Sequence, residues 1–352
     1  MATIRDVAKA AGVSIATVSR VLNGKTHLAG DTRQKVMAAA EELGYQKDRV
    51  AAAMRTGRTG AIGLVIGDLR NPFYAVLAHC VERAAHSHQT SLVLSNAHED
   101  EQNYENGIRA LVKQGVDGIL VVPPSRVAPG WKHPDLPKGM AAVILDRQVS
   151  GGKLASVVID STRAVQDMAE HLRDVGYRRP AYLAGPEFSL SGKRRTETMK
   201  KALNSCGFGK IEVEYCPHEA LSAASSARVL LALCQPDVII CDSNQTALGA
   251  LMITKSMGIH LGPDLGLVAI DDNSWLSVMS PAVTVIDRPV DKLANLGVNV
   301  LMKQIYGAAY VPKPGDKLVS GEATFIPRES TRGPHMCAQY AGRWLPESGK
   351  SV

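Results

Sequence analysis

Residues 4–24 read IRDVAKAAGVSIATVSRVLNG, and residues 32–45 read TRQKVMAAAEELGY. Apolar residues recur in both stretches at the three- and four-residue spacing of amphipathic helices, and Gly12 separates two such segments in the first stretch. Two helices joined by a short turn that contains glycine form a helix-turn-helix unit. We therefore predict three short helices within residues 1–45, the first two of them joined at Gly12.

Capping residues set the limits of these helices. Thr3 and Asp6 have the spacing of a capping box at the start of the first helix. Ser14 can cap the second helix, because its side-chain oxygen can accept from backbone N–H groups of the first turn. The third helix is expected to run from about Asp31 to Leu43.

The second helix has an inward and an outward face. Val18 and Val21 have core spacing, whereas small or apolar residues lie outward near its start and Arg20 follows one turn later. Small or apolar side chains can contact thymine methyl groups, and arginine can bind guanine through two hydrogen bonds. A helical hairpin that merely packs on the rest of the chain is the alternative. The candidate DNA-contacting residues here are Ser14, Ile15, Ala16, Thr17, Ser19, Arg20, Asn23, His27 and Arg33.

Positive charge is concentrated at the start of the chain. The 352 residues carry a formal net charge of +6, and residues 1–60 alone hold ten Lys/Arg against five Asp/Glu. A basic segment joined to a near-neutral body is typical of a head that binds a polyanion. A solvated basic surface is the alternative, so charge alone does not decide between the two.

The two quoted stretches resemble the DNA-binding head of the lactose-repressor (LacI/GalR) family of bacterial transcription regulators in residue types, spacing and position. The resemblance continues along the chain to about residue 330. It implies a transcription regulator, a repressor, that binds double-stranded operator DNA as a homodimer and responds to a small-molecule effector.

Residues 46–60 are expected to form a hinge helix or linker. The segment is rich in alanine and favours a short helix that would be unstable by itself in water. The resemblance implies that this helix folds on operator DNA and that Met54 wedges into the minor groove, at a position where the family usually has leucine. Lys47 stands where the family commonly has proline, so we expect this hinge to order less readily. A flexible linker is the alternative.

From residue 61 onward, short β-branched runs alternate with amphipathic helical stretches. Continuous apolar strands that alternate with helices are typical of parallel sheets covered on both faces. Ten strands exceed what one ordinary sheet holds, so we predict an α/β body of two doubly wound parallel-sheet subdomains, similar to periplasmic binding proteins. The predicted strands are 61–68, 91–97, 118–123, 141–146, 156–160, 180–186, 211–215, 237–242, 266–271 and 283–287.

Polar residues follow many of these strands, at the carboxyl ends where open α/β sheets bind ligands. Carboxylates, arginines and aromatic rings in one cleft suit a small polyhydroxylated ligand, although each residue taken singly fits a cap or a loop. The resemblance points to the same segments, and Arg195 and Asp271 match its pattern best. The candidate effector-binding residues are Phe73, Tyr74, Arg147, Arg195, Ser243 and Asp271.

The effector is expected to be a sugar or sugar derivative bound between the two lobes. Basic residues at 193–195, together with Arg147, place positive charge near this cleft and favour an acidic or phosphorylated sugar. The alternative is that residues 193 and 194 point to solvent. Ser243-Asn244 departs from the Asn-Asp pair usual in the family, which implies an unusual effector or a reshaped pocket.

Signatures of catalysis and of metal binding are missing from the sequence. It contains no GxxxxGK[ST] phosphate loop, no GxGxxG that opens a helix after a strand and no GxSxG elbow. The six cysteines are scattered without a CxxC pair. We therefore expect no enzyme activity, no cofactor and no bound metal. An enzyme on an α/β scaffold is a competing interpretation.

No apolar run approaches the length of a membrane span, and the N-terminus lacks the features of a secretory signal. We therefore expect a cytoplasmic protein without a membrane partner. A solute-binding protein with the same two-lobed body is a competing interpretation, and the basic head argues against it.

The expected organisation has four parts. They are a helix-turn-helix head (1–45), a hinge (46–60), an effector-binding and dimerisation body (61–330) with crossovers between lobes near 160, 289 and 321, and a C-terminal tail (331–352). The tail lacks the heptad repeat of a tetramerising coiled coil, so we expect a dimer.

Overall fold

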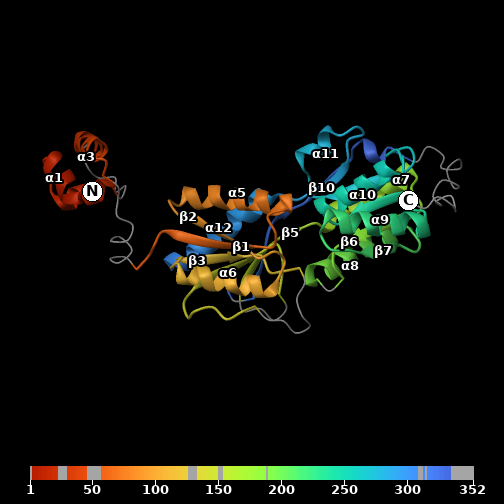
Figure 1. Ribbon diagram of the computed structural model, residues 1–352, viewed down its shortest axis with the longest axis horizontal. Helices are drawn as coiled ribbons and strands as arrows, with labels where there is room; N and C mark the ends of the chain where they lie inside the picture. Colours follow the sequence, from red (N-terminus) through yellow and green to blue (C-terminus); the bar gives the residue numbers. More distant parts are fainter. Residues whose placement is uncertain are drawn as a thin grey trace, which may run out of the picture. The chain divides into compact units, whose positions relative to one another are not determined.

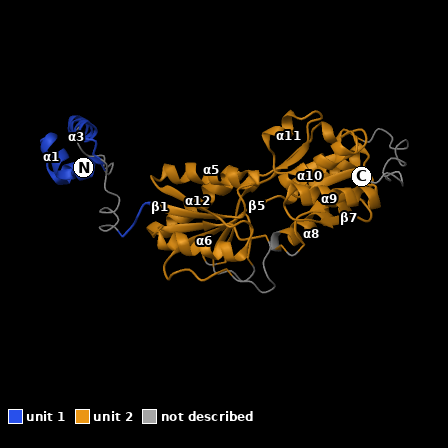
Figure 2. Cartoon of the chain, viewed as in Figure 1, with its two compact units in different colours: residues 1–60 blue, residues 61–352 orange. Residues whose placement is uncertain are grey.

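The computed structural model divides the chain into two compact units, residues 1–60 and 61–352 (Figure 1; Figure 2). Each unit has a hydrophobic core of its own. The residues that the structure describes are 2–22, 30–45, 57–125, 133–149, 154–187, 189–307, 312–313 and 315–333. Most of the predicted hinge (46–56) and of the predicted tail (334–352) therefore lies outside the described residues.

The first unit contains the three predicted helices, α1 (Ile4–Ala10), α2 (Ile15–Leu22) and α3 (Gly30–Glu42). The capping box is confirmed, because the backbone N–H of Thr3 donates to Asp6 at 2.8 Å and that of Asp6 donates to Thr3. Ser14 accepts from the backbone N–H of Thr17 at the start of α2. The core of the unit consists of Val7, Ala8, Val18, Val21, Val36, Ala39 and Ala40.

The second unit contains two six-stranded sheets, ordered β11-β5-β4-β3-β1-β2 and β12-β10-β9-β8-β6-β7. Neighbouring strands are parallel except for β10 and β12, which are antiparallel. The strands of the first sheet are β1 (Ala61–Ile66), β2 (Ser91–Asn96), β3 (Gly118–Val121), β4 (Ala141–Leu145), β5 (Ala155–Asp160) and β11 (Lys317–Glu322). Those of the second are β6 (Pro180–Ala184), β7 (Glu212–Tyr215), β8 (Val238–Cys241), β9 (Gly266–Ile270), β10 (Thr284–Asp287) and β12 (Thr324–Ile326).

All ten predicted strands are present, and the prediction of two doubly wound sheets is confirmed. The sequence analysis missed β11 and β12. Both are edge strands in which exposed and half-buried positions replace a continuous apolar run. The apolar pattern that predicts a central strand is therefore absent from them.

Helices cover both faces of each sheet (Figure 1). The first sheet and its helices make up the first lobe, and the second sheet and its helices make up the second lobe. In the first lobe, α5 and α12 share a core on one face of the sheet, and α6 covers the other face. In the second lobe, α9 and α10 pack on one face and α7 and α8 on the other. The helices are α5 (Pro72–Ser87), α6 (Glu101–Lys113), α7 (Thr162–Val175), α8 (Leu190–Ser205), α9 (Ala220–Cys234), α10 (Asn244–Ser256), α11 (Ser274–Val278), α12 (Val290–Tyr306) and the 3-10 turn η1 (Glu329–Thr331).

The chain passes between the lobes at three places. It leaves the first lobe after β5, returns between β10 and α12, and leaves again between β11 and β12. None of the described helices has the length and apolar character that a membrane span requires.

Candidate functional site

The outward face of α2 is open to solvent. Ser14, Ile15, Ala16 and Arg20 are exposed, and Arg33 is exposed on α3. Thr17 and Ser19 are half-buried. A helix with solvated polar side chains on one face and a packed apolar face on the other can enter a major groove without losing its core. Asn23, His27 and Met54 lie outside the described residues.

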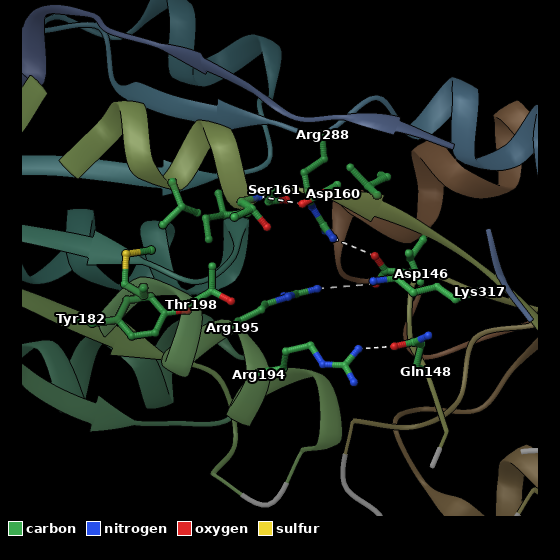
Figure 3. Close-up of a pocket in the computed structure, with 16 residues that line it drawn as sticks. Asp146, Gln148, Asp160, Ser161, Tyr182, Arg194, Arg195, Thr198, Arg288 and Lys317 are labelled. Atoms are coloured by element: carbon green, nitrogen blue, oxygen red, sulfur yellow. Dashed lines mark hydrogen bonds and ion pairs between the residues drawn. The ribbon is translucent and has the colours of Figure 1, made fainter. Parts of the chain in front are cut away.

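A cavity of about 190 Å³ lies between the two lobes (Figure 3), and we call it the main cavity. It is lined by the ends of β4 and β5 on one side and by α8 on the other. Its charged lining residues are Asp146, Asp160, Arg194, Arg195, Arg288 and Lys317. Basic side chains thus outnumber acidic ones on its wall.

Arg195 reaches across the main cavity from α8 toward the first lobe (Figure 3). Its guanidinium nitrogens lie 3.6 Å from Asp146 and 3.6 Å from Asp242. These separations allow charge attraction but exceed hydrogen-bond length. Because a quarter of the side chain is exposed, its N–H groups can donate to a ligand.

Asp242 is buried behind Arg195. The Tyr182 hydroxyl donates to one carboxylate oxygen, and His218 Nε2 lies 3.1 Å from the other. Burial by itself raises the pKa of Asp242, but Arg195, His218 and Tyr182 outweigh that effect and lower it to about 2. An ionised Asp242 therefore helps to orient Arg195.

Arg288, directly after β10, links the two lobes. It donates to Asp146 of the first lobe at 2.7 Å and to both carboxylate oxygens of Asp271 in the second lobe at 2.5 and 2.9 Å. Its guanidinium also lies 4.4 Å from the ring centre of Phe73. The sequence analysis missed Arg288, although the rule of polar residues at strand ends would have included it.

Asp146 and Asp271 occupy equivalent positions at the ends of β4 and β9. Both have left-handed backbones, with φ of 63° and 71°. Such a conformation is unfavourable for a residue other than glycine and is maintained by the surrounding contacts. Here the contacts are backbone N–H bonds to the neighbouring strand and the shared Arg288.

Tyr74 and Arg147 form a separate network inside the first lobe. Arg147 donates to Tyr74 at 2.6 Å, to Glu99 at 3.1 Å and to the carbonyl of Pro123. Burial raises the pKa of Glu99, but Arg147 and Ser125 outweigh it and lower that pKa to about 2. This network stabilises the loops of the first lobe, and neither Tyr74 nor Arg147 lines the main cavity.

The predicted effector residues are therefore divided among four places, one of which is the network of Tyr74 and Arg147 inside the first lobe. Arg195 lines the main cavity, whereas Phe73 and Asp271 line a second cavity of about 240 Å³ on the other side of Arg288, which we call the aspartate-lined cavity. Ser243 lines neither, because its hydroxyl caps α10 in a capping box with Thr246. The sequence analysis did not propose Gln148 or Lys317, which also line the main cavity.

Comparisons with known proteins match both units of the chain. The model "Bacterial regulatory proteins, lacI family" matches residues 3–48, and "Periplasmic binding proteins and sugar binding domain of LacI family" matches residues 59–293. The chain belongs to the LacI family. This LacI-family protein is a DNA-binding transcriptional regulator with a ligand-binding body, as the sequence analysis predicted.

Individual relatives agree with this membership. The LacI-family chain is 30% identical to the HTH-type transcriptional regulator PtxS of Pseudomonas plecoglossicida over 87% of its own length and 90% of that protein. It is 31% identical to the ribose operon repressor of Halalkalibacterium halodurans, over 87% and 91%. These relatives are transcriptional regulators, not enzymes.

Solved structures show the same fold. The Lac repressor dimer bound to operator and the anti-inducer ONPF is similar with a TM-score of 0.76 and 25% identity, over 94% of this chain and 99% of that one. The complex of the transcriptional regulator CelR with cellobiose is similar with a TM-score of 0.67 and 26% identity, over 94% and 100%.

Proposed function

We propose that this protein is a cytoplasmic, homodimeric repressor without enzyme activity, and that a sugar or sugar derivative with an acidic group binds in its main cavity. The observation that carries the effector proposal is Arg195, which enters the cavity with N–H donors available. The names of similar proteins support a sugar, because they include a ribose operon repressor and a regulator complexed with cellobiose.

The hydrogen bonds of the cavity wall support an acidic ligand over a neutral one. Of the carboxylates that line the cavity, Asp146 already accepts from Arg288 through one oxygen, which reduces its capacity to accept from sugar hydroxyls. Arg194 and Lys317 add two more cations to the wall. A wall rich in donors suits a carboxylate or a phosphate. Lys193, by contrast, is exposed and does not line the cavity.

An exposed apolar surface on the second lobe supports the homodimer. Leu221 and Leu233 of α9 are 73% and 79% exposed, and Leu248 and Met252 of the adjacent α10 are 39% and 42% exposed. Large apolar side chains gathered on one surface mark an interaction site. The similarity to the Lac repressor dimer favours a second copy of this chain as the partner.

A dimer would present two α2 helices to the two halves of an operator, with the candidate residues of the head and Met54 as its contacts. A ligand that bridges Arg195 and the first lobe would favour one relative orientation of the lobes. That orientation would set the spacing of the two heads, which is how a distant cavity can control DNA binding.

A thermal-shift screen with matched sugars tests the effector proposal. Gluconate and glucose 6-phosphate are compared with glucose, and other acids with their parent sugars, on the full chain. A ligand that binds the folded state raises its melting temperature. We expect at least one acid to stabilise the protein more than its parent sugar, and to do so less in Arg194→Ala. Neutral sugars that stabilise at lower concentration than their acids would contradict the proposal.

A further inference from the structure

The aspartate-lined cavity has more negative charge than the neighbouring cations neutralise. Four aspartates line it: Asp271, Asp272, Asp287 and Asp291. Arg288 pairs with Asp271, and Arg328 donates to Asp272 at 2.9 Å. Asp287 and Asp291 have no ion pair with a Lys or Arg side chain in the described part of the chain.

Asp287, the last residue of β10, lies among these carboxylates. Its side chain is half-buried, and burial raises its pKa, as do Asp272 and Asp271, which together outweigh the lowering by the backbone N–H of Asp272 and by Arg328. An opposite charge within a few ångströms of the carboxylate would reverse this effect. The wall of the aspartate-lined cavity therefore favours a cationic occupant.

Two asparagines in the same cavity have unused hydrogen-bonding atoms. Asn244, the first residue of α10, is 3% exposed, and its buried Oδ1 has no hydrogen-bond partner within the described residues. Asn273 has a buried Nδ2 that also has no hydrogen-bond partner within the described residues. Buried polar atoms without partners are unfavourable and are rare in native proteins. Asn244 requires a donor, and Asn273 requires an acceptor.

We propose that the aspartate-lined cavity is a ligand site for a primary ammonium group with a neighbouring hydroxyl, as in an amino sugar or an amino alcohol. The ammonium has three N–H donors. One donates to Asn244 Oδ1, and the positive charge is attracted by Asp287 and Asp291. The neighbouring hydroxyl accepts from Asn273 Nδ2. Pro72, Val76 and Pro289 supply apolar walls for the carbon atoms.

A metal ion fits this cavity less well than an ammonium. No group of three or more His, Cys, Asp or Glu side chains is placed to hold a metal among the residues that the structure describes. Asp271 and Asp272 are already held by guanidinium groups, and a proline-lined wall offers no further ligands. An organic cation uses both the carboxylates and the apolar wall.

The ammonium site is separate from the effector site proposed above. Arg288 lines both cavities and stands between them, with hydrogen bonds to Asp146 on one side and Asp271 on the other. The main cavity has a wall rich in cations, and the aspartate-lined cavity has a wall rich in carboxylates. Failure of either proposal therefore leaves the other intact, and Arg195→Ala is expected to leave the ammonium site unchanged.

Binding of D-glucosamine to the full chain tests the inference. At pH 7 its ammonium is charged, whereas D-glucose and N-acetyl-D-glucosamine are neutral matches of similar shape. Titration calorimetry and thermal shift are expected to show binding of glucosamine at least tenfold tighter than of either neutral sugar. Ethanolamine compared with ethylene glycol repeats the test for a smaller ligand.

Asp287→Asn keeps the size and polarity of the side chain and removes its charge, so the variant is expected to fold. It should weaken glucosamine binding about tenfold, which is the effect of losing one close charge pair of about 1.4 kcal/mol. Asp167→Asn on α7 is the control, because Asp167 lines neither cavity and pairs with Arg163, and this variant should bind as the parent does. The inference is wrong if no amine binds more tightly than its neutral match, or if Asp287→Asn and Asp167→Asn bind glucosamine equally.

Discussion

Replacing Arg288 with methionine should destabilise the body strongly, because it removes the side chain that joins the lobes. The guanidinium makes three hydrogen bonds of 2.5 to 2.9 Å to Asp146 and Asp271, and it lies over Phe73. Its own side chain is 7% exposed, and those of the two aspartates are 4% and 8% exposed. Methionine preserves the apolar stem and leaves two buried carboxylates without this partner.

The expected cost is about 3–5 kcal/mol, the range for breaking a buried ion pair by removing one partner. Loss of the contact with Phe73 contributes about 1–2 kcal/mol within that total. Equilibrium urea unfolding of the full chain at pH 7 measures the change. Arg173→Met is the control, because Arg173 pairs with Asp174 on the surface and its replacement should cost much less.

The pH dependence of the Arg288→Met effect supplies a second check. Burial raises the pKa of Asp146, but Arg288 and Arg195 outweigh it and lower that pKa. A depressed carboxyl pKa gives stability that is present above its ordinary value and is lost as the pH falls. The difference between wild type and variant should therefore shrink on acidification. A cost equal to that of Arg173→Met at pH 7 would refute the role of Arg288.

Three further predictions concern DNA contacts and acid stability. Arg20→Ala should cost about 1–3 kcal/mol per half-site on operator and much less on random DNA, measured by gel shift; equal losses would make Arg20 a phosphate contact. Met54→Ala should reduce operator bending in a circular-permutation assay, and an unchanged bend would show that Met54 does not wedge. Asp242 should contribute about 2 kcal/mol of stability at neutral pH, lost as the pH falls from about 4 toward 2; Asp242→Asn should flatten the acid limb of the stability curve, and an unchanged limb would contradict this.

Much of the fold follows from the sequence because its central strands are buried on both faces. Residues 141–145 and 266–270 are continuous apolar runs, and every residue in them is buried. The missed strand Lys317–Glu322 has an alternating, mainly polar pattern at a sheet edge, which also occurs in loops. Its pairing with β5 depends on tertiary contacts that no local pattern contains.

The candidate site was harder to predict because strand ends do not reveal side-chain direction. Asp146 and Arg147 are neighbours in the sequence, yet their side chains lie in different places, and the backbone at Asp146 is left-handed. Asp146 faces the main cavity, whereas Arg147 is buried with Tyr74 and Glu99 in the first lobe. Lys317 was missed because its strand was missed.

The response of operator binding to an acidic sugar, in wild type and in Arg195→Ala, tests the central claim most directly. Fluorescence anisotropy measures the affinity for operator with and without the acid found in the thermal-shift screen. In wild type the acid is predicted to change operator affinity roughly tenfold or more, within the usual range of allosteric coupling. Arg195→Ala should abolish that change and leave the ligand-free affinity within a few-fold of wild type. A full response of Arg195→Ala to the acid would contradict the account.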